Sequence, residues 1–204
     1  MEFEKGTLIW FTGVAASGKS TISRAVEKEL RRRGIKVENL DSDEIRANLS
    51  PELGYTMDAR DLNTKRLAFM GKVLARNGVF TLVAAVSSLR KFRDRARSWV
   101  DHFVEVYVKC PLEECQKRDP KGLYARAKRG EINDIAGLHQ PFEDPLKPEV
   151  TLETDKLTVE QCCAQVIRKL EEMKYIPAEK GAGDYSEEDE EKVVERLKGL
   201  GYVE

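Results

Sequence analysis

Hydrophobic residues along this chain occur in two alternating kinds of stretch. Three runs rich in β-branched and aromatic residues, 7–12, 79–86 and 103–109, are bounded by turn residues and are typical of strands that are buried on both faces. We predict two shorter strands at 36–40 and 149–153. Stretches with helical spacing of apolar residues lie between or after them, at 19–33, 60–77, 89–99, 112–118 and 158–174. Because strands and helices alternate, we predict a three-layer α/β domain with a parallel sheet, which binds ligands at the carboxyl ends of its strands.

Two segments of the chain depart from this alternation. Residues 119–148 combine glycines, basic residues and four prolines around a short helical stretch, which is typical of a mobile surface cover. We predict that they form a lid over a main domain of residues 1–176. In residues 177–204 the composition changes again, because Ser186 can cap a helix that has an acidic first turn and one apolar face. We predict a linker followed by one appended, acidic and amphipathic C-terminal helix.

The charge balance limits the kinds of partner that we expect. Lys and Arg total 35 and Asp and Glu total 36, so a net charge of −1 gives no reason to expect a nucleic acid or an anionic membrane as the main partner. No apolar run approaches the roughly 18 residues of a membrane span, and we find no N-terminal signal pattern. We therefore expect a soluble, cytoplasmic protein. The four cysteines lack the spacing of a zinc site, and we expect reduced thiols.

A phosphate-binding motif follows the first predicted strand. Residues 13–20, GVAASGKS, match G-x-x-x-x-G-K-[ST] and precede a predicted helix, as this motif requires. The backbone N–H groups of such a loop surround phosphates, the lysine reaches the β and γ oxygens, and the hydroxyl binds Mg²⁺. We predict a P-loop NTPase fold in which a nucleoside triphosphate and Mg²⁺ bind at Gly13, Val14, Ala15, Ala16, Ser17, Gly18, Lys19, Ser20 and Thr21.

Two aspartates follow the second predicted strand. Asp41 and Asp43 are two residues apart, and in an extended segment such residues project to the same side, so both are expected to face the phosphates. One would hold Mg²⁺ through water, with Ser20 as its partner ligand, and the other would orient an acceptor hydroxyl. The alternative is that Asp41, Ser42 or Asp43 caps a following helix. Because neither N-K-x-D nor L-S-G-G-Q occurs, the sequence favours neither a GTPase nor a transport ATPase.

Four stretches of the sequence resemble adenylylsulfate kinase. They are GTLIWFTGVAASGKSTIS, LDSDEIRANLSPELGYTMDARDLN, RDPKGLYARA and PFEDPLKPEVTLET, and the resemblance runs in order over about residues 5–175. This family uses MgATP to phosphorylate the ribose 3′-hydroxyl of adenosine 5′-phosphosulfate (APS) in sulfate assimilation. The resemblance implies ATP and Mg²⁺ as cofactors, APS as the substrate, and a homodimer.

The resemblance also implies roles for individual residues. Lys19, Asp41 and Asp43 would be catalytic, Arg46 and Arg60 would contact the phosphosulfate, and Asn63 would contact the substrate. Tyr55 and Phe142 would hold the adenine between two rings, since base–aromatic stacking contributes about 1–3 kcal/mol per base. Lys121 in the lid would lie near the substrate, and Arg118 beside it is assigned to ATP.

Val86 and Ser87, at the end of the third strand, are predicted to line the substrate pocket. Ser87 matches a serine that is described as a phosphoserine intermediate in some family members. Because we identify no nearby base in the sequence, we favour direct phosphoryl transfer. Arg90 and Arg93 follow on a helix that we expect to be solvated, although both could meet an anion there.

The chain departs from the family pattern at several positions. Ser42 replaces a glycine, Ala59 replaces an acid, AVSS stands where FISP is usual, and Tyr55 replaces Phe. If that glycine needs a positive φ, Ser42 would be strained or would shift Asp43. Two alternatives therefore remain open, namely a P-loop kinase of another small alcohol or nucleotide, and a regulatory subunit that binds ATP without turnover.

Overall fold

The computed structural model describes residues 3–179 and contains a sheet of five parallel strands. The strands are β1 (Leu8–Thr12), β2 (Val37–Asp41), β3 (Phe80–Ala84), β4 (Phe103–Lys109) and β5 (Val150–Glu153). Their order in the sheet is β2-β3-β1-β4-β5, and every adjacent pair is parallel. All five predicted runs form strands, and the prediction of a parallel sheet is confirmed.

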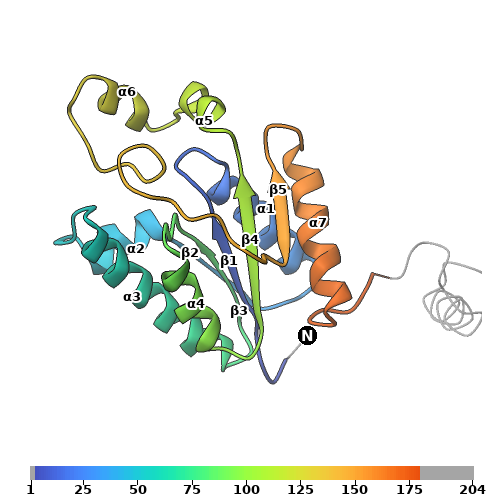
Figure 1. Ribbon diagram of the computed structural model, residues 1–204. Coiled ribbons are helices and arrows are strands. Elements are labelled where there is room, and N and C mark those ends of the chain that lie inside the picture. The colour runs from blue at the N-terminus through green and yellow to red at the C-terminus, as the bar shows by residue number, and fades with distance from the viewer. Residues whose placement is uncertain (1–2, 180–204) are drawn as a thin grey trace, which may run out of the picture.

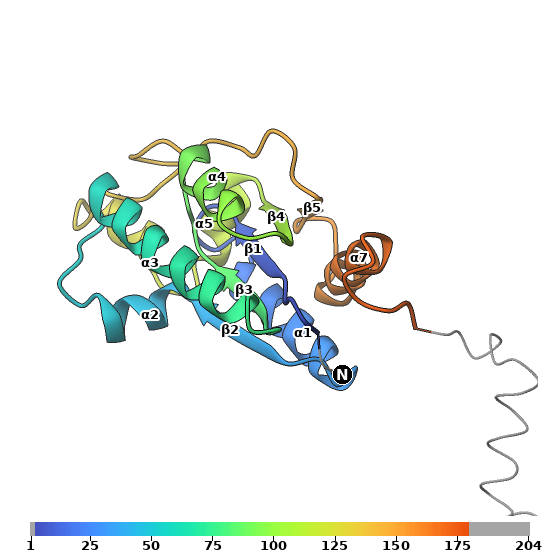
Figure 2. The same cartoon turned by 90° about the horizontal axis from the view of Figure 1, so that it is seen from below.

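Helices cover both faces of the sheet, as Figures 1 and 2 show. They are α1 (Lys19–Arg32), α2 (Ser42–Leu49), α3 (Met57–Ala75), α4 (Arg90–Ser98), α5 (Leu112–Arg118), α6 (Leu123–Lys128) and α7 (Val159–Glu172). Helices α1 and α7 pack on one face of the sheet, and α3 and α4 pack on the other. The result is the three-layer arrangement that the alternating pattern predicts.

The central strand β1 supplies side chains to both cores. Ile9 and Phe11 are fully buried in the cluster beneath α1 and α7, whereas Leu8 and Trp10 are fully buried in the cluster beneath α3 and α4. This division follows from the alternation of side chains along a strand. Because β1 has β3 on one side and β4 on the other, the loop that follows β1 lies at the middle of the sheet edge.

Helix α2 differs from the sequence prediction, which placed Asp41 and Asp43 on an extended segment. The helix begins directly after β2, and Asp41 is its N-cap, since an Asp41 side-chain oxygen accepts a hydrogen bond from the Asp43 backbone N–H at 2.9 Å. Asp43 and Glu44 lie in the first turn, where negative charge favours a helix. The shared-face argument for a strand was therefore wrong, and the capping alternative describes Asp41 correctly.

The predicted lid segment, residues 119–148, joins α6 to long loops that pass over the carboxyl ends of the strands (Figure 1). The predicted tail helix lies outside the described residues. Within the described part of the chain, no helix is long and apolar enough to cross a membrane.

The α1 packing leads to a stability prediction. Leu30 is fully buried in the core beneath α1 and α7. We expect Leu30→Ala to lower the free energy of unfolding by about 2–5 kcal/mol, because it removes buried methyl groups and leaves a cavity. Leu146 is 76% exposed, and we expect Leu146→Ala to change the free energy of unfolding by no more than about 0.5 kcal/mol. Urea unfolding measures both variants, and equal losses would contradict the assigned core.

Candidate active site

The phosphate-binding loop connects β1 to the N-terminus of α1. Gly18 is the N-cap of α1 with φ 104°, and Ala16 also has a positive φ of 59°. A Cβ atom at Gly13 would lie only 2.4 Å from the Val108 carbonyl oxygen, so the loop passes too close to β4 for any other residue there. A loop that leads into a helix N-terminus in this way presents backbone N–H groups and the positive end of the helix dipole, so it is suited to bind an anion.

Lys19 lies within this loop, and its surroundings change its acidity. Its Nζ donates a hydrogen bond to the Val14 carbonyl oxygen at 2.7 Å. Burial lowers the pKa of Lys19 to about 8, and the nearby carboxylates Asp43 and Asp41 oppose that shift. A bound polyanion would therefore stabilise the charged form of Lys19.

Ser20 and Asp41 join the loop to the end of β2. The Ser20 hydroxyl donates to the second oxygen of Asp41 at 2.7 Å. A hydroxyl and a carboxylate are the hard oxygen donors that Mg²⁺ prefers, and Mg²⁺ bound to a nucleotide takes most of its ligands from phosphates and water. Residues 3–179 contain no group of three or more His, Cys, Asp or Glu side chains suited to a metal. The pair thus fits a Mg²⁺ ion shared with a nucleotide rather than one caged by protein alone.

Asp43 lies in the first turn of α2 and faces the lid. Its carboxylate accepts a hydrogen bond from the Lys121 ammonium, and both side chains are exposed. This bond raises the pKa of Lys121. The structure therefore brings the predicted acid and the predicted lid lysine together.

Two arginines surround the ring of Tyr55. The guanidinium carbons of Arg46 and Arg60 lie 4.7 Å and 5.5 Å from the ring centroid. Arg46 is buried and donates to the Gly54 carbonyl at 2.6 Å. Arg60 donates to the Asp134 carbonyl at 2.7 Å, and burial lowers the pKa of its guanidinium. Both cations are thus fixed in place by backbone carbonyls.

Asn63 and Ser42 form a further contact beside Asp43. Asn63 is buried, and its Nδ2 donates to the Ser42 hydroxyl at 3.0 Å, whereas its Oδ1 is buried without a hydrogen-bond partner. An unpaired buried acceptor is costly, so this oxygen is available to a donor from a ligand or from water. Ser42 is helical and is not among the described residues with positive φ, so the strain that the missing glycine suggested does not occur.

Ser87 is buried just beyond β3, next to half-buried Val86. It has a left-handed φ of 43°, and its hydroxyl accepts a hydrogen bond from the Trp10 indole at 3.1 Å. The Val86 carbonyl accepts one from Thr12 at 2.7 Å. These two residues are therefore tied to the central strand.

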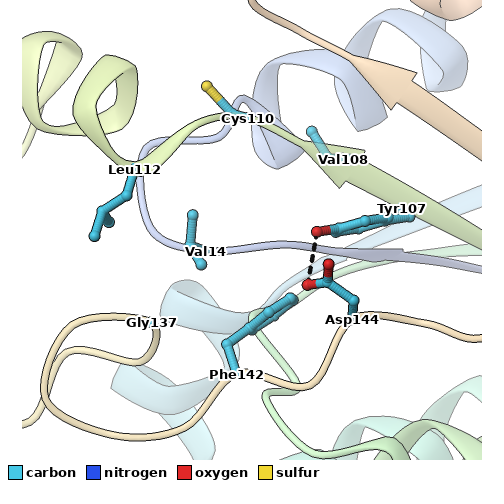
Figure 3. A pocket seen from close by; sticks show the side chains of 8 residues that line it. All are labelled: Val14, Tyr107, Val108, Cys110, Leu112, Gly137, Phe142 and Asp144. Carbon is cyan, nitrogen blue, oxygen red and sulfur yellow. Dashed lines mark hydrogen bonds between the residues drawn. The ribbon is translucent and has the colours of Figure 1, made fainter.

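Phe142 lines a cavity of about 220 Å³ between the phosphate-binding loop, the end of β4 and the lid (Figure 3). The Phe142 and Tyr107 rings are nearly parallel with centroids 6.3 Å apart, and the Tyr107 hydroxyl donates to Asp144 at 2.8 Å. Tyr55, predicted as the partner ring of Phe142, does not line this cavity. Sequence analysis did not identify Tyr107 or Asp144. The position of Tyr107 near the carboxyl end of β4, beside the P-loop strand, could have indicated it.

Arg118 contacts the phosphate-binding loop through Thr154, a residue that sequence analysis did not identify. Arg118 donates to the Thr154 carbonyl at 2.7 Å, and the Thr154 hydroxyl donates to the Ser17 carbonyl at 2.9 Å.

Thr21 is exposed on α1. Arg93 is buried and paired with Glu105, and was therefore wrongly placed on a solvated face where it could meet an anion.

A central parallel sheet, a phosphate-binding loop after β1 and a long segment that passes over the strand ends are the features of a P-loop kinase. The family model for adenylylsulphate kinase matches residues 5–153. The chain belongs to the adenylylsulphate kinase family, and it is an ATP-dependent phosphotransferase.

Named relatives agree with this assignment. An adenylyl-sulfate kinase of Halothermothrix orenii is 45% identical over 86% of this chain and 95% of its own length. One from Rippkaea orientalis is 43% identical over 85% of this chain and 96% of its own length.

Solved structures agree with the fold. The Mycobacterium tuberculosis APS kinase CysC in complex with AMPPNP and APS has a TM-score of 0.80 and 37% identity, and the match covers 83% of this chain and 99% of that one. Shikimate kinase from Aquifex aeolicus has a TM-score of 0.51 and 15% identity over 83% of this chain and 99% of that one, which shows a shared fold alone.

The lowered pKa of Lys19 leads to a prediction about protons. Above pH 8 the neutral form of Lys19 dominates, and a bound triphosphate would favour the charged form, so binding must take up a proton and weaken as pH rises. At about pH 8.5 we expect uptake of roughly 0.7 proton per nucleotide. Calorimetry of a non-hydrolysable ATP analogue in buffers of different ionisation enthalpy measures it. Lys19→Met should abolish the uptake, and a wild-type value of zero would contradict the lowered pKa of Lys19.

Proposed function

We propose that this chain transfers the γ-phosphate of ATP to the ribose 3′-hydroxyl of APS and releases 3′-phosphoadenylylsulfate and ADP. The observation that carries this proposal is the contact of Asp43, on the helix after β2, with Lys121 of the lid, close enough to the phosphate-binding loop that both charges act on Lys19. Family membership and the relatives named above support the same substrates.

In the proposed reaction the 3′-oxygen forms a bond to the γ-phosphorus while the bond to the bridging oxygen of ADP breaks. The proton of the 3′-hydroxyl passes to the Asp43 carboxylate. Lys19 and the backbone N–H groups of the loop hold the phosphate charge. Because the transition state is loose, alignment and charge stabilisation contribute more than strong base catalysis.

The proposed reaction requires Mg²⁺. Ser20 and Asp41 would hold it, in agreement with their hard oxygen donors. When bound, Mg²⁺ supplies positive charge that neutralises the β- and γ-phosphate oxygens.

Three kinds of side chain would hold the acceptor, namely cations, a buried amide and aromatic rings. Arg46, Arg60 and Lys121 would bind the phosphosulfate, because arginine forks match such oxyanions well. Asn63 would accept a hydrogen bond from the acceptor through its unpaired oxygen. Tyr55 and Phe142 would contact the adenine, and Val86 and Ser87 would form part of the pocket wall.

Direct transfer is the proposed route. The Ser87 hydroxyl accepts its hydrogen bond from the Trp10 indole, which is a donor only and cannot remove a proton. Ser87 therefore has a structural partner where a phosphoenzyme mechanism needs a base.

The test of the proposed function is a coupled assay of ADP release with ATP, Mg²⁺ and APS. We expect APS to stimulate release far more than other nucleotides or sugar alcohols do. Stimulation by another acceptor would instead indicate a different P-loop kinase, and tight ATP binding without stimulation would indicate a regulatory subunit.

The proposed base leads to a mutational prediction. We expect Asp43→Ala to lower kcat by about 10²-fold or more, with little loss of APS affinity, because it removes the group that orients the hydroxyl. Glu44→Ala, in the same helical turn, is the matched control and should keep wild-type turnover. Near-normal kcat in Asp43→Ala would remove Asp43 from the mechanism.

We also propose a homodimer, as the family resemblance implies. Two exposed apolar side chains on α3, Leu62 and Phe69, support it, since residues seven apart lie on one face of a helix. Light scattering should give twice the chain mass, and Phe69→Lys should shift it toward one chain, unlike the control Leu146→Lys. A monomeric wild type would contradict the proposal. The cytoplasmic location stays a prediction.

A further inference from the structure

Arg93 on α4 is a buried charge that the proposed mechanism does not use. Its side chain is 2% exposed, and three of its nitrogens donate hydrogen bonds. Nε donates to the Glu105 carboxylate at 2.7 Å, Nη1 to the Ser87 carbonyl at 2.6 Å, and Nη2 to the Glu143 carbonyl at 2.7 Å. The guanidinium therefore joins three segments that are distant in sequence.

Two of these segments carry proposed walls of the acceptor pocket. Ser87 follows β3 and has a left-handed φ of 43°, a conformation that persists in a non-glycine residue only where its surroundings hold it. Glu143 is the neighbour of Phe142, and the Arg93 guanidinium carbon lies 5.9 Å from the Phe142 ring centroid. One rigid group thus sets the distance between these two walls.

Further contacts make residues 87–93 and 142–144 a single unit. The Glu143 N–H donates to the Ser88 carbonyl at 2.8 Å, and the Arg90 N–H donates to the Glu143 carboxylate at 2.7 Å. Arg90 Nε also donates to the Asp144 carbonyl at 2.8 Å. Arg93, which is 2% exposed, and Ser88, which is 0% exposed, are the most deeply buried residues of this set.

We propose that Arg93 is a positioning residue for the acceptor, which fixes Ser87 and Phe142 relative to each other and so governs binding of the adenylyl group. This inference rests on the proposed function, because the acceptor is the one named there. The role requires the planar fork of arginine, since a lysine ammonium cannot reach three acceptors in these fixed directions.

Arg97 offers a matched control on the same helix. It also contacts Glu105, at 3.4 Å, and pairs with Glu149 at 2.7 Å. Its described hydrogen bonds reach neither Ser87 nor Glu143. A change at Arg97 therefore perturbs the Glu105 carboxylate but removes no hydrogen bond to Ser87 or Glu143.

Two variants test the positioning role. Arg93→Met alone would leave the buried Glu105 without its close partner, so the double variant Arg93→Met with Glu105→Met removes both charges at once. Arg93→Lys keeps a positive charge beside Glu105 but lacks the planar guanidinium that donates to three acceptors. Thermal unfolding checks that each variant folds, and kinetics then give KM for APS and for ATP separately.

We expect both variants to raise KM for APS by about tenfold or more while KM for ATP stays within about twofold, because the acceptor alone is misplaced. Arg97→Gln should keep both values. If the double variant does not fold, Arg93→Lys decides the question.

Wild-type KM for APS in a folded double variant or in Arg93→Lys would overturn the inference. An equal rise of both KM values would also overturn it, because that result indicates general loosening. A wild-type enzyme without APS-stimulated ADP release would instead remove the proposed function, so the two failures are distinguishable.

Discussion

The hydrogen bond between Ser20 and Asp41 is the contact on which the site depends. It ties the first turn of α1 to the end of β2, although β3 lies between β1 and β2 in the sheet. Because Asp41 also caps α2, the same carboxylate sets where that helix begins and where Asp43 lies. The phosphate-binding loop and the proposed base therefore share one anchor.

The sheet was predictable because its signal is local. Runs such as residues 79–86 are apolar on both faces, which suits a strand between two helical layers. The phosphate-binding loop was predictable for a similar reason, since its glycines meet a steric demand, seen where Gly13 passes the Val108 carbonyl. The sequence also identified Lys121 and Asp43, which the structure brings into contact.

Other features depend on contacts between distant segments and were not predictable. Helix α2 is short, and its N-cap Asp41, which accepts from the Asp43 N–H, is also the last residue of strand β2. Arg93 resembles its exposed neighbours in sequence, and only the folded chain places Glu105, Ser87 and Glu143 around it. Thr154 could not be identified from the sequence, because it reaches the site through the pairing of β5 with β4 and through its contact with Arg118.

The two ends of the lid are held by forces of different kinds. Near its start, Lys121 and Asp43 form an exposed pair, which water and salt weaken and which contributes at most about 1 kcal/mol. Near its end, Glu143 is attached through a buried guanidinium that salt hardly screens. Raising the ionic strength therefore weakens the attachment at Lys121 and leaves the attachment at Glu143 in place.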